Sequence, residues 1–216
     1  MRTTAYCFSL IATRYSNTKL GTRAGRIATA LNSTRAFTRL LDDLPMLKAT
    51  LTYGFGKQGE PILSRVLQVI ENVAYQLFFP VEHLALLCQL EVLPVANRQK
   101  WVSRCTTLWA VALVCVISKN VMLLAELLNA KEKLLKSEPS LDRGESGLHS
   151  SKAKELDSRL RLTKLTIIKD SCDFLNAVNW LPITNFLWSG KLSPSQSAIA
   201  GLVSSLVGFQ ILRLTS

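Results

Sequence analysis

The fold is decided by residues 170–212, which read DSCDFLNAVNWLPITNFLWSGKLSPSQSAIAGLVSSLVGFQIL. The last 21 residues of this stretch carry no charge. Ser193 suits a helix cap, and Pro194 suits the first helical position, where a backbone N–H is not needed. A helix starting at Pro194 would be roughly 28 Å long, close to the hydrocarbon thickness of a bilayer, about 30 Å. The pattern predicts a C-terminal transmembrane helix over 191–212. The alternative is the buried core helix of a soluble bundle.

Small residues recur at four-residue spacing within this segment. The two rows are Ala200, Ser204 and Gly208, and Ser197, Gly201 and Ser205. Small side chains one helical turn apart let two helix backbones approach closely, which favours helix association in lipid. We therefore expect Gly201, Ser205 and Gly208 to lie in a helix–helix contact. An incidental run of small residues is the alternative.

The chain carries a strong positive charge. Its 216 residues include 26 Lys and Arg against 15 Asp and Glu, a net charge of +11, and its mean hydropathy is +0.21. A surplus of this kind fits an anionic membrane surface, basic loops at a membrane, or nucleic acid. The sequence has no zinc-finger spacing and no basic run with interleaved aromatic residues. We therefore expect a membrane partner and no nucleic acid.

The sequence lacks patterns typical of catalysis or metal binding. It has two histidines, His83 and His149, and no G-x-S-x-G, H-E-x-x-H or Walker sequence. Its five cysteines are odd in number, irregularly spaced and without a C-x-x-C, which does not describe a disulfide framework. We predict that the protein is not an enzyme and has no catalytic, cofactor-binding or metal-binding residues.

The N-terminal region is basic. Its first 41 residues contain no acid and seven basic residues: Arg2, Arg14, Lys19, Arg23, Arg26, Arg35 and Arg39. This composition is typical of an organelle transit peptide, and equally of a basic helix that lies on a membrane surface. Both interpretations stay open on these residues alone.

Residues 19–47 show apolar stripes at helical spacing. One stripe contains Leu20, Ala24, Ile27 and Leu31, and a second contains Phe37, Leu40, Leu41, Leu44 and Leu47. The phase slips at residues 32–33, which predicts a bend or two helices, and Pro45 is expected to end or kink the second helix. The functional interpretation is an amphipathic membrane-surface segment, and the alternative is two helices of a bundle.

The middle of the chain is predicted to be helical as well. Pro61 opens an amphipathic helix that Pro80 should interrupt, and a shorter helix should follow over 81–93. The apolar run after residue 101 contains Lys119, which is costly within a membrane span. This segment is therefore either a first membrane helix or a half-buried helix packed against the C-terminal one.

These patterns give an all-α fold class, a membrane-associated helical bundle with amphipathic helices and one or two transmembrane helices. We divide the chain into six parts: a basic segment (1–18), an amphipathic helical region (19–100), a candidate first membrane helix (101–128), a charged linker (129–151), a basic helix ending in a D-x-x-N-A-x-N-W-L-P motif (152–190), and the C-terminal transmembrane helix (191–212).

That motif carries a resemblance to a known family. Its residues, with the aromatic segment that follows, are Asp173, Asn176, Asn179, Trp180, Pro182, Trp188 and Gly190. Together with the final span they resemble the C-terminal end of the peroxin-11 family, in its gamma branch. Weaker likenesses at 18–23, 39–44 and 80–83 occur in the matching order, so that the resemblance covers about residues 17–212. Family members usually begin with a further helix, and we expect none ahead of Lys19 here.

The resemblance implies a peroxisomal membrane protein that remodels and elongates the membrane ahead of fission, and so controls peroxisome size and number. It implies membrane lipids, homo- or hetero-oligomers with family members, and a fission adaptor with dynamin-like machinery as partners. The alternative is a mitochondrial or other organelle membrane subunit, or a solute-passing helical protein, imported through its basic N-terminus.

The resemblance also implies a role for residues 19–47 as the membrane-remodelling helix. The side chains expected to insert are Leu20, Ile27, Leu31 and Phe37. Those expected at the lipid surface are Arg23, Arg26, Arg35 and Arg39.

Overall fold

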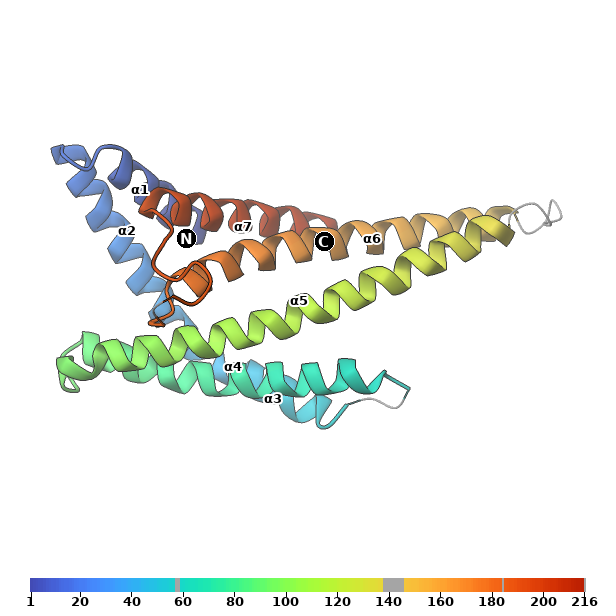
Figure 1. Ribbon diagram of the computed structural model, residues 1–216, viewed down its shortest axis with the longest axis horizontal. Helices are drawn as coiled ribbons and strands as arrows, with labels where there is room; N and C mark the ends of the chain where they lie inside the picture. The colour runs from blue at the N-terminus through green and yellow to red at the C-terminus, as the bar shows by residue number, and fades with distance from the viewer. Residues whose placement is uncertain (57–58, 138–145, 184, 216) are drawn as a thin grey trace.

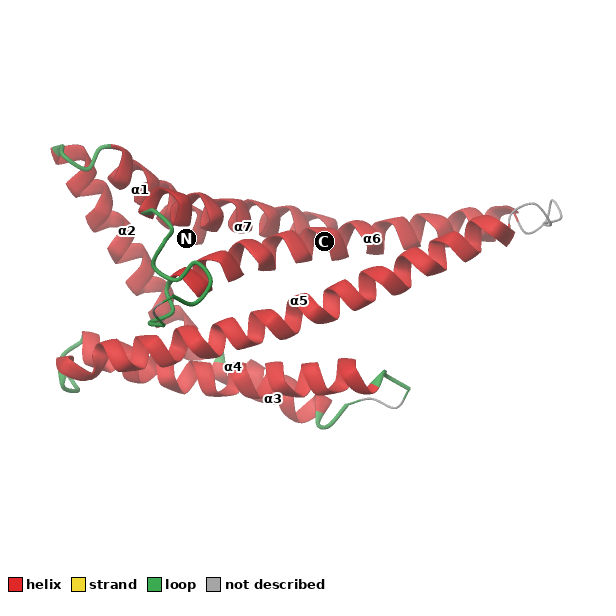
Figure 2. Cartoon of the chain, viewed as in Figure 1, coloured by secondary structure: helices red, strands yellow, loops and turns green. Residues whose placement is uncertain are grey.

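The computed structural model describes residues 1–56, 59–137, 146–183 and 185–215, and within these ranges the regular structure is helical (Figure 2). The elements are α1 (Arg2–Arg14), α2 (Lys19–Thr38), η1 (Arg39–Leu41), α3 (Asp43–Tyr53), α4 (Ile62–Gln89), η2 (Val95–Asn97), α5 (Arg98–Ser137), α6 (Ser146–Asn179) and α7 (Pro194–Thr215). The all-α fold class is confirmed.

Local hydrogen bonds fix where the helices begin. At the start of α7 the Ser193 hydroxyl accepts a bond from the Gln196 N–H (3.2 Å), and the Gln196 side-chain oxygen accepts one from the Ser193 N–H (2.8 Å). This is a reciprocal capping box, with Pro194 in the first helical position. The Thr18 hydroxyl caps α2 in the same way by accepting from the Gly21 N–H (3.1 Å). The predicted start of the C-terminal helix is confirmed.

Helices α5, α6 and α7 run side by side in alternating directions (Figure 1). Lys131 of α5 binds Asp157 of α6 at 2.6 Å, and Trp109 stacks on Trp180 with ring centroids 6.1 Å apart, so α5 and α6 are antiparallel. The start of α7 lies against the end of α6, where the Ser197 hydroxyl donates to the Asn176 side chain at 2.7 Å. Helices α6 and α7 are therefore also antiparallel. It follows that α5 and α7 run in the same direction.

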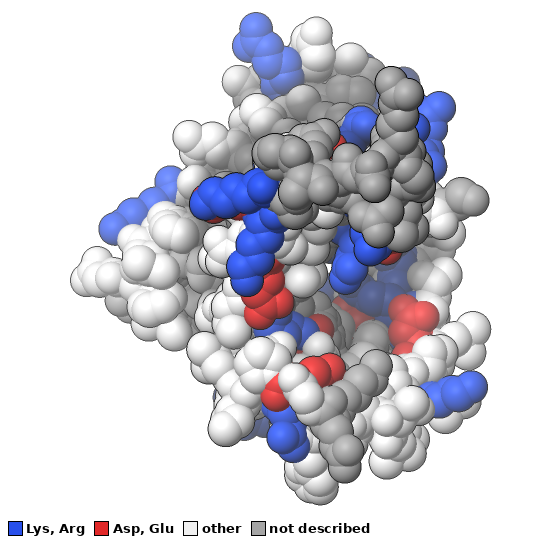
Figure 3. All heavy atoms as spheres, turned by 90° about the vertical axis from the view of Figure 1, so that its right-hand side faces the viewer, with Lys and Arg blue, Asp and Glu red and all other residues white. Residues whose placement is uncertain are grey.

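The remaining helices pack on the two sides of this row. Helix α4 packs along α5 on one side and contacts α3 on another, while α1 packs on both α2 and α7 (Figure 1). The α5–α6 hairpin extends past the other helices, and Lys and Arg side chains surround this end of the molecule (Figure 3). The exposed residues Lys133, Lys136, Lys152 and Lys154 belong to this hairpin. Part of the basic surplus therefore lies on the projecting end of this hairpin.

The core is small and centred on the junction of α5 and α6. Its buried residues are Ala110, Leu113, Ala177, Val178 and Leu181, with Trp109, Phe174 and Trp188 packed against them. In α7 the buried positions are small or polar, while large apolar side chains such as Ile199, Leu206 and Phe209 are exposed. This is the reverse of a core helix in a soluble bundle, where the large apolar side chains are buried. It favours the transmembrane interpretation of α7.

Two helical segments are long and apolar enough to span a membrane within the described residues, Val95–Lys136 and Pro194–Thr215. The lysine that weakened the first candidate from sequence alone is neutralised. Lys119 forms an ion pair with Glu71 of α4 and also donates to the Gln68 side chain. A paired charge costs less in an apolar environment than an isolated one. Helix α5 packs along α4 and α6, whereas α7 packs on α6 and α1.

Four expectations about helix boundaries were wrong. A helix, α1, does precede Lys19. Helix α2 runs unbroken through residues 32–33, because its packed face consists of small residues and needs no continuous stripe of large ones. Pro45 lies in the first turn of α3, where proline is tolerated, rather than at a helix end. Pro80 lies inside α4 and does not end it, because packing along α5 on both sides outweighs one lost hydrogen bond.

The segment predicted as a charged linker is also largely helical where it is described. Helix α5 continues to Ser137 and α6 begins at Ser146. Residues 138–145 lie outside the described part of the chain. The expectation failed because the charged residues of 129–151 are good helix formers, and the two helices support one another through contacts such as Lys131–Asp157.

Candidate functional site

The predicted motif forms a joint between α6 and α7. Asn176 is fully buried, its amide donates to the Ser197 carbonyl at 3.1 Å, and its side-chain oxygen accepts from the Ser197 hydroxyl at 2.7 Å. The Asn176 side chain thus binds both the carbonyl and the hydroxyl of Ser197, which lies in the first turn of α7. Because an unpaired buried amide is costly, this reciprocal pair fixes the register of the two helices.

The rest of the motif holds the connection between these helices. Asn179 accepts bonds from the Leu192 N–H through its side chain (2.9 Å) and from the Gly190 N–H through its carbonyl (3.0 Å). Gly190 has a φ of +69°, a left-handed conformation that glycine adopts without strain. The indole N–H of Trp188 donates to the Leu175 carbonyl at 2.9 Å, and Trp180 stacks on Trp109 of α5. Pro182 follows the end of α6 and is exposed.

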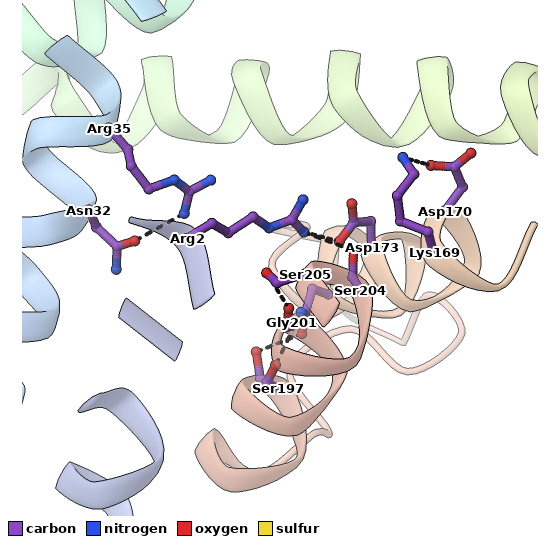
Figure 4. A network of polar contacts seen from close by, with 11 residues as sticks. Arg2, Asn32, Arg35, Lys169, Asp170, Asp173, Ser197, Gly201, Ser204 and Ser205 are labelled. Atoms are coloured by element: carbon purple, nitrogen blue, oxygen red, sulfur yellow. Dashed lines mark hydrogen bonds and ion pairs between the residues drawn. The ribbon is translucent and has the colours of Figure 1, made fainter. Parts of the chain in front are cut away.

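The first motif residue binds the N-terminal helix. Asp173 is buried and forms an ion pair with Arg2, which also donates to the Ser204 hydroxyl at 3.1 Å (Figure 4). Arg2 therefore ties α1 to α6 and α7 at once. Sequence reasoning assigned Arg2 only to a basic segment, because no local pattern connects it to residues about 170 positions away.

The small residues of α7 make contacts within the same chain. Gly201 lies directly against the Tyr6 ring of α1, and any Cβ at position 201 would overlap that ring. The buried Ser205 hydroxyl donates to the Gly201 carbonyl at 2.9 Å. A Cβ at Gly208 would come no closer than 3.9 Å to the Lys169 side chain of α6. Within this chain, Gly201 therefore lies in close contact with α1, whereas Gly208 meets α6 only loosely.

Helix α2 has two different faces. Its packed face consists of Gly21, Ala24 and Ala28 against α1, and Gly21 has no room for a Cβ beside the Tyr15 carbonyl. Its other apolar residues are uncovered: Leu20, Ile27 and Phe37 are 55%, 42% and 45% exposed, while Leu31 is half-buried. A helix that packs through small residues and exposes its large ones presents an apolar surface outward.

The four arginines of the predicted surface helix divide into two pairs. Arg23 and Arg26 are exposed near the uncovered apolar residues. Arg35 instead turns inward and donates to the Asn32 side chain at 3.2 Å, and Arg39 forms an ion pair with Glu82 of α4. Burial raises the pKa of the Glu82 carboxyl, although Arg39 opposes the shift. The expectation that all four arginines lie at the lipid surface is therefore wrong for Arg35 and Arg39.

Comparison with known proteins identifies the family. A model of the peroxisomal biogenesis factor 11 (PEX11) family matches residues 1–212. The chain belongs to the PEX11 family. It is 30% identical to peroxisomal membrane protein 11C of Homo sapiens and 32% identical to that of Mus musculus, in each case over 96% of this chain and 85% of the relative. No solved structure matches the chain.

PEX11 membership confirms the resemblance found in the sequence and extends it to the N-terminus, since the match includes α1. It assigns the protein to the peroxisomal membrane and to peroxisome proliferation and fission, and it does not favour a mitochondrial subunit. PEX11 is a family of biogenesis factors and not a known enzyme family.

Proposed function

We propose that α2, continued by α3, inserts shallowly into one leaflet of the peroxisomal membrane and elongates it ahead of fission. The observation that carries this proposal is the uncovered apolar face of α2, made by Leu20, Ile27 and Phe37 beside the exposed Arg23 and Arg26. An amphipathic helix buried about 5–10 Å into the headgroup region expands one leaflet and favours curvature.

The uncovered surface continues beyond α2. In α3 the apolar side chains of Leu44, Leu47 and Leu51 are exposed, and Phe55 is exposed just after the helix ends. Soluble monomers rarely leave so many large apolar residues uncovered in one region. Burying them in lipid contributes roughly 25 cal/mol per Å². Each arginine at an anionic surface adds about 1 kcal/mol.

A second uncovered apolar row supports self-association. Along α4 the exposed residues Leu63, Val66, Ile70, Val73 and Leu77 alternate at spacings of three and four. This is the a/d pattern by which helices pair with one another. The oligomer expected from the family is therefore proposed to form through α4, and contact with a fission adaptor and dynamin-like machinery remains part of the same proposal.

Vesicle reshaping tests the role of α2. Full-length protein reconstituted into anionic vesicles should produce tubules visible by electron microscopy. Arg23→Glu with Arg26→Glu should reduce tubulation at low salt and matter less at high salt, where screening already weakens the attraction. Lys133→Glu with Lys136→Glu is the matched control, because it reverses the same charge on the exposed end of α5.

The same assay can refute the proposal. The control variant should tubulate vesicles like the wild type. Equal tubulation by the Arg23/Arg26 variant and the wild type at low salt would show that α2 does not engage the membrane surface.

A further inference from the structure

A large cavity lies between the α1–α2 pair and the three helices α4, α5 and α6. Its volume is about 1020 Å³. Its charged lining residues are Arg2, Arg35, Arg39, Asp42, Glu82, Arg98, Lys169, Asp170 and Asp173. Charged groups inside a helical protein need partners of opposite charge. In this cavity some of the cations have such a partner and others do not.

Most cations of this cavity have carboxylate partners. Arg2 pairs with Asp173, Arg39 with Glu82, and Lys169 with Asp170. Arg35 and Arg98 are different: Arg35 donates to the amide oxygen of Asn32 and Arg98 to that of Gln89, and no carboxylate of the described residues forms an ion pair with either. Burial, together with the charges of Arg39 and Arg2, lowers the pKa of the Arg35 guanidinium. This side chain therefore has positive charge that the described carboxylates leave unneutralised.

Two more donors in the cavity lack acceptors. The Nε atoms of Arg2 and Arg39 are buried and have no hydrogen-bond partner among the described residues. Figure 4 shows Arg35 extending from α2 toward the side chain of Arg2, which reaches Asp173 on α6. Three guanidinium groups from α1, α2 and η1 thus line one cavity with donors to spare. An anion with several acceptor oxygens, such as a phosphate group, would satisfy them.

The cavity also has an apolar wall, which lies near the expected level of the lipid headgroups. Phe78 and Phe79 of α4 and Trp109 and Leu113 of α5 line it. Pro194 and Ser197, in the first turns of α7, line it as well. Because α5 and α7 run in the same direction, the cavity lies near the starting end of both candidate spans. The headgroups of a bilayer lie at that level, with the hydrocarbon beginning just beyond it.

We propose that this cavity binds one anionic phospholipid, with its phosphate against Arg35, Arg2 and Arg39 and an acyl chain along Phe78, Phe79 and Trp109. The site is distinct from the uncovered face of α2, which meets the membrane as a surface. It would hold a single lipid molecule within the helical bundle.

Photocrosslinking tests the site on the full-length protein in detergent micelles. The probe is phosphatidic acid carrying a photoactivatable acyl chain. Labelling should saturate at one lipid per chain, map to the segments around residues 78–79 and 109–113, and be displaced by unlabelled phosphatidic acid but not by phosphatidylcholine. Arg35→Met should reduce saturable labelling about tenfold or more, as expected for losing a hydrogen bond to a charged group. Arg161→Met, which changes an exposed arginine of α6 that lies outside both the cavity and the α2 surface, should leave it unchanged.

Three results would overturn the proposal. The first is labelling that does not saturate, or that maps to the outer faces of α2 and α7. The second is equal loss of labelling in Arg35→Met and Arg161→Met. The third is displacement by inorganic phosphate as effectively as by phosphatidic acid, which would mean a free-phosphate site. Should Arg35→Met fail to fold, the stoichiometry and map of the wild-type crosslinks still decide.

Discussion

Gly201 shows how single residues set the packing of this protein. It is the position where α7 approaches the aromatic ring of Tyr6 so closely that no side chain fits. Gly208, two turns further along, faces only the end of a flexible lysine side chain at 3.9 Å. The two glycines belong to the same helix, and they differ in the side chain that lies opposite each of them.

Alanine substitutions at these glycines should therefore have opposite consequences. Gly201→Ala should lower the free energy of unfolding by about 1–3 kcal/mol, because the added methyl group overpacks a tight contact. Gly208→Ala should be neutral or slightly stabilising, because alanine favours the helix and meets open space. Thermal unfolding of both variants in detergent measures the difference. Equal melting temperatures would mean that α1 does not dock on α7 as described.

At the scale of the helices, α4 presents a continuous apolar row to its surroundings. Val66 and Val73 lie in that row, one heptad apart, and both are exposed. If the row forms a helix–helix interface between copies, charges placed there should separate the copies. Because the row faces outward, the fold of each chain should survive the change.

We therefore expect Val66→Glu with Val73→Glu to reduce crosslinked oligomers recovered from membranes by about tenfold, with the monomer still folded. The control is Val92→Glu, an exposed valine that lies after the end of α4, outside this row and outside both candidate spans. Crosslinking yields that fall equally in both variants would point to a general effect of added charge on the membrane protein, and unchanged yields would place the interface elsewhere.

The sequence allowed the helices to be predicted better than their contacts. The capping box at Ser193 and Gln196 and the motif around Asn176 are local signals, and the structure bears out the helix start that the first indicates. Contacts between distant segments have no such signal. Arg2 binding Asp173, Glu82 binding Arg39 and Lys119 binding Glu71 each join parts of the chain far apart in sequence. These pairs hold Arg2 and Arg39 inside the bundle, so the residues of the candidate site could not be identified without the structure.

At the scale of the whole molecule, the direction of the helices constrains the membrane topology. Because α5 and α7 run parallel, both can cross a bilayer only if the chain returns between them. The returning segment is the second half of α6, which lies alongside both helices. Several of its polar side chains have partners within the bundle, as Asp173 does with Arg2 and Asn176 with Ser197, while Lys164 is exposed. We therefore predict that the second half of α6 forms a third crossing, in which Asp173 and Asn176 are paired inside the bundle.

Residues at the two ends of these helices should consequently lie on opposite sides of the membrane. Single-cysteine variants Lys136→Cys and Arg213→Cys should react alike with an impermeant maleimide on intact peroxisomes. Gln99→Cys and Lys191→Cys should show the opposite accessibility, and all four should react after permeabilisation. Reaction of the Lys136 and Lys191 variants from the same side would rule out the return through α6.

The central claim is that the uncovered apolar face of α2 reshapes the peroxisome. The most direct measurement is peroxisome length in cells that overexpress the full-length protein with Ile27→Asp, compared with Ile62→Asp as a control. Both replace an exposed isoleucine, and Ile62 lies at the start of α4, outside the proposed wedge. We predict that both variants reach peroxisomes, that the Ile62 variant elongates them like the wild type, and that the Ile27 variant leaves them spherical. Normal elongation by the Ile27 variant would contradict the claim.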